Sequence, residues 1–229
     1  MDSARVADYF IVVGAFVEFQ RIEEDSSGNP FMKGPPSLRT SFHSFVTDRY
    51  PVEDRPGEEL PEGIQLFCLP YGVQVSEVPK RPSLHSFVHT NPVGEHLQGY
   101  CLTFYDPITA TQRSNLAAQL KGVSLPRNLF VPRCLCIVSR WSFSSAFKQV
   151  LCGLYLQHFT PSPLPIERFI CNFIDDVPAP AAARVDVTYY LNEQPITFKY
   201  GPPNEPQVLK FSAQTIPNPL CYYTHTFSI

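Results

Sequence analysis

The stretch that decides the fold runs from residue 133 to residue 180. It contains Cys134-Leu-Cys-Ile-Val-Ser-Arg-Trp-Ser-Phe, an amphipathic segment, Leu164-Pro-Ile-Glu-Arg-Phe-Ile, and an exit through Asp176-Val-Pro-Ala-Pro. The first apolar run has the composition of a buried strand. Two helical patterns follow it with almost no loop between them. This order predicts one strand and two consecutive helices that pack as layers around a core.

The two helical patterns are the most regular in the chain, because their apolar residues recur three and four positions apart. Ser142 is expected to cap the first helix, and Pro161 and Pro163 to end it. Its apolar face comprises Phe143, Phe147, Val150, Leu151, Leu154 and Tyr155. Pro165 is expected at the first position of the second helix. The second apolar face comprises Ile166, Phe169, Ile170, Phe173 and Ile174.

Short segments rich in β-branched and aromatic residues predict strands over the rest of the chain. These segments are 6–14, 38–50, 64–69, 84–90, 97–105, 129–138, 185–191 and 196–200. Turn residues between Thr90 and Glu95 predict an antiparallel hairpin of 84–90 with 97–105. Asp106-Pro107 resembles a helix start, with a polar helix running to Lys121. The fold class predicted is α+β.

Bulk composition restricts the class of protein. The 229 residues have room for one large domain or two small ones, and 44% of them are apolar. The net charge of −3 provides no basic field for phosphate backbones, which argues against nucleic acid as a partner. The apolar run 9–17 is too short to span a bilayer and is flanked by Asp8 and Glu18, so we interpret it as a strand of a soluble protein. Residues 20–37 and 51–63 are predicted to be solvated loops.

The cysteines are odd in number and lie mostly in apolar runs. They are Cys68, Cys101, Cys134, Cys136, Cys152, Cys171 and Cys221. No Cys-x-x-Cys occurs, and Cys134 and Cys136 would share one face of a strand. We interpret the cysteines as buried reduced thiols that pack as small hydrophobes, which predicts a reducing cytosolic compartment.

Few residues qualify as a reactive site. His85 and His89 share a strand face, a geometry that suits a metal, but no second ligand pair is near in sequence. Phosphate-binding Gly-rich loops, zinc-protease motifs and nucleophile elbows are absent from the sequence. We therefore predict no catalytic residue, no cofactor and no metal site.

Five further residues are interpreted as having no role in a site. Asp175 and Asp176 end a helix and are expected to be solvated. Glu167 and Arg168 are expected on a surface face of the second helix. Trp141, the only tryptophan, stands beside Arg140 at the strand-to-helix corner, where we favour a role as a core plug over one as a binding platform.

Six short motifs, taken in order, resemble the upstream, longin-like part of a DENN module. They are Arg5-Val-Ala-Asp-Tyr-Phe, Phe67-Cys-Leu-Pro-Tyr-Gly, the strand 99–105, the junction 134–143, the segment 163–170 and Val177-Pro-Ala-Pro. The resemblance implies an antiparallel sheet flanked by helices, followed by a short incomplete Pro-rich β extension. It implies an upstream DENN domain over 4–200 and the start of a truncated core lobe over 201–216. The tail 217–229 matches nothing in the family, which suggests a truncated isoform or gene model.

The family resemblance also implies a function. DENN modules exchange nucleotide on Rab GTPases, so a Rab-type small GTPase is the expected partner, in vesicle traffic. The chain is expected to be cytoplasmic and peripheral on endomembranes. All six motifs read as structural positions, so none assigns a partner-binding residue. With the core lobe missing, little exchange activity is expected from the chain alone, and the helix faces that this lobe would cover are expected to be bare.

Two alternatives remain open. The chain could be a non-catalytic Rab-binding or scaffold longin module, because longin lobes also serve as docking platforms. A small-molecule enzyme is a formal alternative, but no converging set of polar residues points to one.

Overall fold

A five-stranded antiparallel sheet forms the centre of the computed structural model, which describes residues 4–16, 19–22, 37–91, 94–120, 122–160, 164–180, 185–191 and 193–199. The strands lie in the order β3-β1-β7-β6-β5. Their bounds are β1 Tyr9–Gly14, β3 Phe45–Tyr50, β5 Ser83–Thr90, β6 His96–Pro107 and β7 Phe130–Ser139. The predicted hairpin is confirmed, because β5 and β6 pair antiparallel, from Ser83 opposite Thr103 to Thr90 opposite His96.

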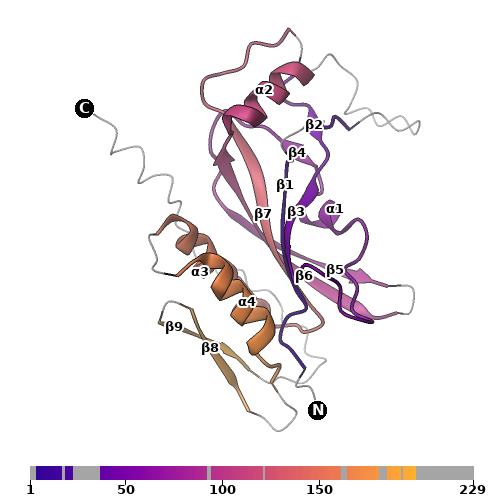
Figure 1. Ribbon diagram of the computed structural model, residues 1–229, viewed down its shortest axis with the longest axis vertical. Helices are drawn as coiled ribbons and strands as arrows, with labels where there is room; N and C mark the ends of the chain where they lie inside the picture. The colour runs from indigo at the N-terminus through magenta and orange to yellow at the C-terminus, as the bar shows by residue number, and fades with distance from the viewer. Residues whose placement is uncertain are drawn as a thin grey trace.

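Helices and two small sheets flank the central sheet (Figure 1). The helices are α1 Ile64–Cys68, α2 Ala110–Gln119, α3 Ser144–Phe159 and α4 Ile166–Asp176. The small sheets pair β2 Ser41–Phe42 with β4 Val73–Gln74, and β8 Val187–Leu191 with β9 Gln194–Phe198. In Figure 1, α3 and α4 lie between the central sheet and the β8–β9 hairpin. The predicted α+β class is confirmed, and the arrangement is consistent with a longin-like domain.

The alternation of side chains along the strands builds two separate cores. One face of the sheet, which we call the helix-pair face, carries Phe10, Leu135 and Ile137 and packs against α3 and α4. The other, which we call the thiol face, carries Ile11 and Cys136 and packs against α1 and α2. Every one of these five side chains is buried. Strands with both faces covered read as continuous apolar runs, as the sequence of β1 and β7 does.

Aromatic rings dominate the helix-pair core. The Phe147 ring on α3 is fully buried and lies 4.8 Å from the Tyr100 ring, 6.4 Å from the Phe173 ring and 5.7 Å from the Phe198 ring, measured between centroids. Phe198 belongs to β9, so the β8–β9 hairpin covers α3 from outside. The expectation that these helix faces would be bare is therefore wrong for α3, whereas Ile166, Phe169 and Ile170 of α4 are only partly buried. A segment after the helices, within the chain, supplies the cover.

One glycine allows the hairpin to approach. A Cβ placed on Gly153 of α3 would lie 2.4 Å from Cδ2 of Leu191 on β8, closer than two carbon atoms can pack. Leu191 is 2% exposed and belongs to the helix-pair core. A glycine at this point of α3 therefore lets β8 pack directly onto the helix backbone.

Two sequence-based boundaries are wrong. Residues 64–68 form the helical turn α1 rather than a strand, because a short apolar run fits either structure and only its surroundings decide. The predicted helix start at Asp106-Pro107 is the end of β6, where Asp106 pairs with Val131 of β7. The helix α2 begins later, at a capping box in which Thr109 and Gln112 exchange hydrogen bonds.

The starts of the two long helices also differ from prediction by one residue. Phe143, not Ser142, is the N-cap of α3, and its side chain makes no capping hydrogen bond. Pro165 is the N-cap of α4 rather than its first helical residue. The helices themselves and their apolar faces are confirmed.

Candidate partner-binding surface

A groove of about 570 Å³ opens on the helix-pair face, where α3 and α4 leave part of the sheet uncovered. Strands β1, β3 and β7 form its floor, and α4 forms one wall. His158, near the end of α3, and the start of α2 close it at the other side. The principal lining side chains are Phe10, Val12, Phe16, Asp48, Tyr50, Phe104, Arg133, Leu135, His158, Ile166, Glu167 and Ile170.

The groove has an apolar floor and a charged rim. Val12 and Leu135 lie on adjacent strands and pair in register. Asp48 pairs with Val12 from the other side, so an exposed carboxylate stands at the sheet edge. The Arg133 guanidinium lies 3.3 Å from the Asp106 carboxylate, measured from Nε to Oδ2. Burial raises the pKa of Asp106, and the positive charges of Arg133 and His158 partly offset that effect.

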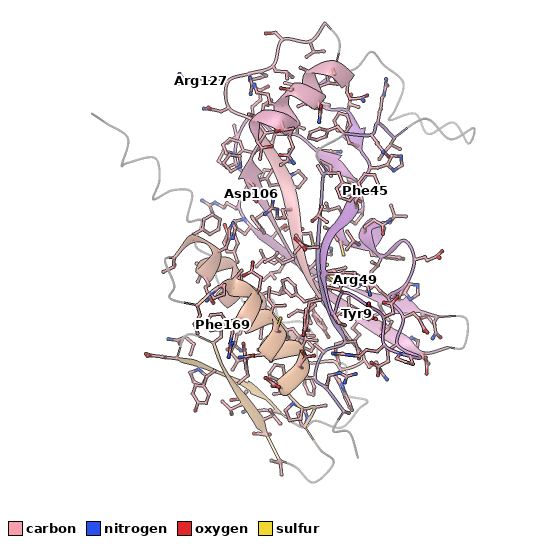
Figure 2. The ribbon with its side chains drawn as sticks, viewed as in Figure 1. Tyr9, Phe45, Arg49, Asp106, Arg127 and Phe169 are labelled. Atoms are coloured by element: carbon pink, nitrogen blue, oxygen red, sulfur yellow. The ribbon has the colours of Figure 1, made fainter. Side chains whose placement is uncertain are left out.

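The loop between β3 and α1 is exposed and is also attached to the sheet by hydrogen bonds and ion pairs. The Tyr9 hydroxyl lies 2.8 Å from Asp54 Oδ1 and 2.6 Å from the Glu58 carbonyl oxygen, and it shares its one proton between these two acceptors. Arg49 forms an ion pair with Asp54, and its guanidinium lies 5.3 Å from the Tyr9 ring centroid (Figure 2). Burial, followed by the hydrogen bond with Asp54, raises the pKa of Tyr9 to about 12. The predicted exposure of the loop over 51–63 is confirmed for Asp54, but the loop is also held to the sheet by these contacts.

A second set of contacts ties α4 to the same edge. Asp175 accepts a hydrogen bond from the Tyr50 hydroxyl and forms an ion pair with Arg55 at 2.7 Å. The hydrogen bond with Asp175 is the largest cause that raises the pKa of Tyr50. Asp175 and Asp176 are both exposed as predicted, and Asp175 in addition binds Tyr50 and Arg55. These contacts fix the wall of the groove against its floor.

The first motif and the strand-to-helix junction meet in space. Arg140 forms ion pairs with the buried Asp8 at 3.0 Å and with Glu58, and Arg5 forms one with Glu58 at 2.8 Å. The Trp141 indole donates to the Arg5 carbonyl at 2.9 Å and is 38% exposed. Trp141 is thus a clamp at the surface and not the core plug that was predicted.

The remaining residues singled out from sequence have separate environments. The His85 ring nitrogen Nε2 lies 3.2 Å from the Phe67 carbonyl, and the His89 ring packs edge-on against the Phe67 ring at 5.9 Å. Phe67 of α1 thus contacts both histidines. Glu167 lines the groove, while Arg168 is exposed outside it. The groove is a feature that sequence reasoning missed, because it depends on how far two helices extend over a sheet.

Cysteines from distant parts of the sequence converge on the thiol face. The sulfur atoms of Cys68, Cys101 and Cys134 all lie within 4.8 Å of one another, and all three side chains are fully buried. Burial raises the pKa of the Cys134 thiol to about 12. The prediction of buried reduced thiols is confirmed for these residues, but their convergence was not foreseen. Cys221 lies outside the described residues.

Comparison with known families finds two matching domains. Residues 44–104 match the uDENN domain, and residues 130–214 match the DENN (AEX-3) domain. No solved structure matches the chain. The chain thus carries both domains of DENN-domain proteins, in the order of the N-terminal part of such a protein. These domains indicate a module of the Rab exchange-factor type, and the family implies small GTPase partners.

The two family matches share one folded unit. Strand β6 lies at the C-terminal end of the uDENN match, and β7 begins the DENN match. The two strands pair at ten positions, from Gln98 opposite Ser139 to Pro107 opposite Phe130. The helix-pair core also joins Tyr100 and Leu102 from one match to Phe147 and Phe173 from the other. Among the described residues, no helix is long and apolar enough to cross a membrane.

Proposed function

We propose that this chain is the upstream, longin-like lobe of a Rab guanine-nucleotide exchange factor and that the groove contacts the GTPase. The observation that carries the proposal is the uDENN and DENN pair of matches on a single sheet with an open groove. The shared sheet also supports residues 4–200 as one functional lobe. Its place of action would be the cytosolic face of endomembranes, in vesicle traffic.

Exchange requires shape rather than reactive groups. An exchange factor binds the nucleotide-free GTPase more tightly than the nucleotide-bound form, and by linkage the nucleotide is then held more weakly. Such a protein is a GTPase regulator and makes no covalent bond. A groove with an apolar floor at Val12 and Leu135 and charges of both signs at its rim suits a switchable protein surface.

The direct test is GDP release. A panel of Rab GTPases loaded with fluorescent GDP would be mixed with the 229-residue chain, and release would be followed by the fall in fluorescence. We expect binding to nucleotide-free Rab but little acceleration, because one lobe supplies only part of the surface that exchange needs. Strong acceleration by this chain alone would contradict the partial-surface argument, and absence of binding to every nucleotide-free Rab would contradict the proposal itself.

Charge reversal at the rim tests the groove. Asp48→Arg on β3 and Glu167→Arg on α4 alter exposed side chains of the groove lining, so the fold should be kept. We expect each to weaken Rab binding roughly tenfold, since like charges opposed across an interface are costly. Asp186→Arg, also exposed but outside the groove lining, is the matched control and should bind as the unmodified chain does.

A non-catalytic Rab-binding or scaffold role is the second candidate, favoured by the same open groove, whose apolar floor and charged rim suit a protein surface. The two roles differ in nucleotide preference. A preference for nucleotide-free Rab in a pull-down supports exchange, and a preference for GTP-loaded Rab supports an effector or scaffold.

A further inference from the structure

Cysteines from three elements meet at one point under the thiol face. Cys68 ends α1, Cys101 lies in the middle of β6, and Cys134 lies on β7. Their three sulfur atoms are within 4.8 Å of one another. Packing alone does not require thiols from separate elements to point at a common centre, whereas a metal ion does.

From this convergence we propose a structural zinc site whose ligands are the Cys68, Cys101 and Cys134 thiolates, with Cys136 as the fourth. In tetrahedral zinc sites the Zn–S distance is about 2.3 Å, which places neighbouring sulfur atoms about 3.8 Å apart. The observed spacing is close enough that side-chain rotation brings the three sulfurs to that distance.

Cys136 is the candidate for the fourth ligand, although its sulfur is not part of the group within 4.8 Å and its side chain would have to rotate to reach the ion. It sits directly opposite Cys101 in the β6–β7 register and two residues from Cys134, on the same face of β7. Its side chain is fully buried, as are those of the other three. Four sulfur ligands with no position open to water are the pattern of a structural zinc site rather than a catalytic one.

The donor set and its surroundings select the kind of metal. The cluster contains sulfur donors alone, without a carboxylate or imidazole among its members. Apolar side chains of the thiol core surround it, including Ile11, Val13 and Ile64. Thiolates prefer soft or borderline ions such as Zn²⁺ over Mg²⁺ or Ca²⁺, which take oxygen ligands.

A bound zinc ion would stabilise the short helix α1. This helix is one turn of five residues, and its N-cap Gly63 makes no side-chain capping bond. So short a helix is not stable by itself. A bond from Cys68 to the metal would hold α1, and with it Phe67, against β5 and β6. Phe67 stacks on Phe87 at 5.2 Å, on the outer side of the same turn.

The experiment uses the full 229-residue chain purified under reducing conditions without chelator. We expect one zinc per chain by elemental analysis. Cobalt(II) added to the chelator-stripped protein should give a thiolate-to-cobalt charge-transfer band, and zinc should displace it. Cys68→Ser and Cys101→Ser are each expected to weaken zinc binding roughly tenfold or more. Cys152→Ser, which alters a partly buried cysteine outside the cluster, should bind zinc as the unmodified chain does.

Each result of the metal-binding experiments either supports or overturns the proposed zinc site. Stoichiometric zinc that is lost in the cluster variants and kept in Cys152→Ser supports the site. Zinc that all variants retain equally is adventitious and overturns it, as does a protein that binds neither zinc nor cobalt. Should the serine variants fail to fold, the cobalt spectrum of the unmodified chain still decides, because it reports sulfur ligation directly.

Discussion

The two faces of the central sheet are covered in different ways. On the helix-pair face, α3 and α4 supply long continuous apolar surfaces, and the β8–β9 hairpin closes over them. On the thiol face, the cover consists of the single turn α1, the helix α2 and the two-residue strands β2 and β4. Large aromatic rings fill the first core, and small thiols gather in the second. Long amphipathic helices thus cover one face with a large apolar area, whereas shorter elements cover the other.

The helix-pair face should show the largest single effect on stability. Phe147→Ala removes a fully buried ring at the centre of an aromatic cluster and is expected to cost about 3–5 kcal/mol of unfolding free energy. Urea denaturation followed by circular dichroism would measure it. Leu156→Ala, on the same helix but 37% exposed, is the control and should cost well under half as much. Equal costs would show that α3 does not pack as described.

Gly→Ala substitutions at two glycines, one in each core, are expected to have intermediate effects on stability and allow the two faces to be compared. Ala in place of Gly usually stabilises a helix by about 1 kcal/mol. At Gly153 the sign should reverse, with a loss of about 1–3 kcal/mol, because the added methyl group meets Leu191. Leu191→Ala in the same chain should recover part of that loss, which a double-mutant cycle would measure.

Gly99→Ala is the counterpart on the thiol face. Its Cβ would lie 2.1 Å from the Phe87 ring, which is itself stacked on Phe67 of α1. A loss similar to that at Gly153 is expected. A clearly smaller loss would mean that the ring and α1 move aside together, so the thiol face would be the softer of the two.

The smallest effect concerns the polar fastening of the β3–α1 loop beside the thiol face. The fold raises the pKa of Tyr9 from its ordinary value of 10 to about 12, so the protonated phenol is favoured in the folded state. Its contribution to stability is therefore fully present below about pH 10 and is lost as the pH rises toward about pH 12.

Tyr9→Phe removes this dependence. At neutral pH the variant should lose about 1 kcal/mol with the hydrogen bonds to Asp54 and Glu58, and between about pH 8 and about pH 11 its stability should fall less than that of the unmodified chain. Urea denaturation at both values provides the measurement. Parallel alkaline curves for the two proteins would contradict the role given to Tyr9.

Long segments with a regular apolar pattern could be predicted from the sequence, whereas short segments could not. The apolar faces of α3 and α4, the buried strands β1 and β7 and the β5–β6 hairpin follow from local periodicity and turn residues. The segment 64–68 carries too few residues to show a period, and its helical turn results from packing against the sheet. Asp106 looked like a helix cap, but its ion pair with Arg133 across β6 and β7 extends the strand instead.

By itself the sequence determined which stretches are apolar on one side, which on both, and which short motifs resemble a DENN module. These properties depend on neighbours within a few residues. Only the tertiary structure decided the groove between α4 and the sheet, the ion pair of Asp8 with Arg140, and the convergence of Cys68 with Cys101 and Cys134. Contacts between distant residues are set by how whole elements pack, and no local pattern encodes that geometry.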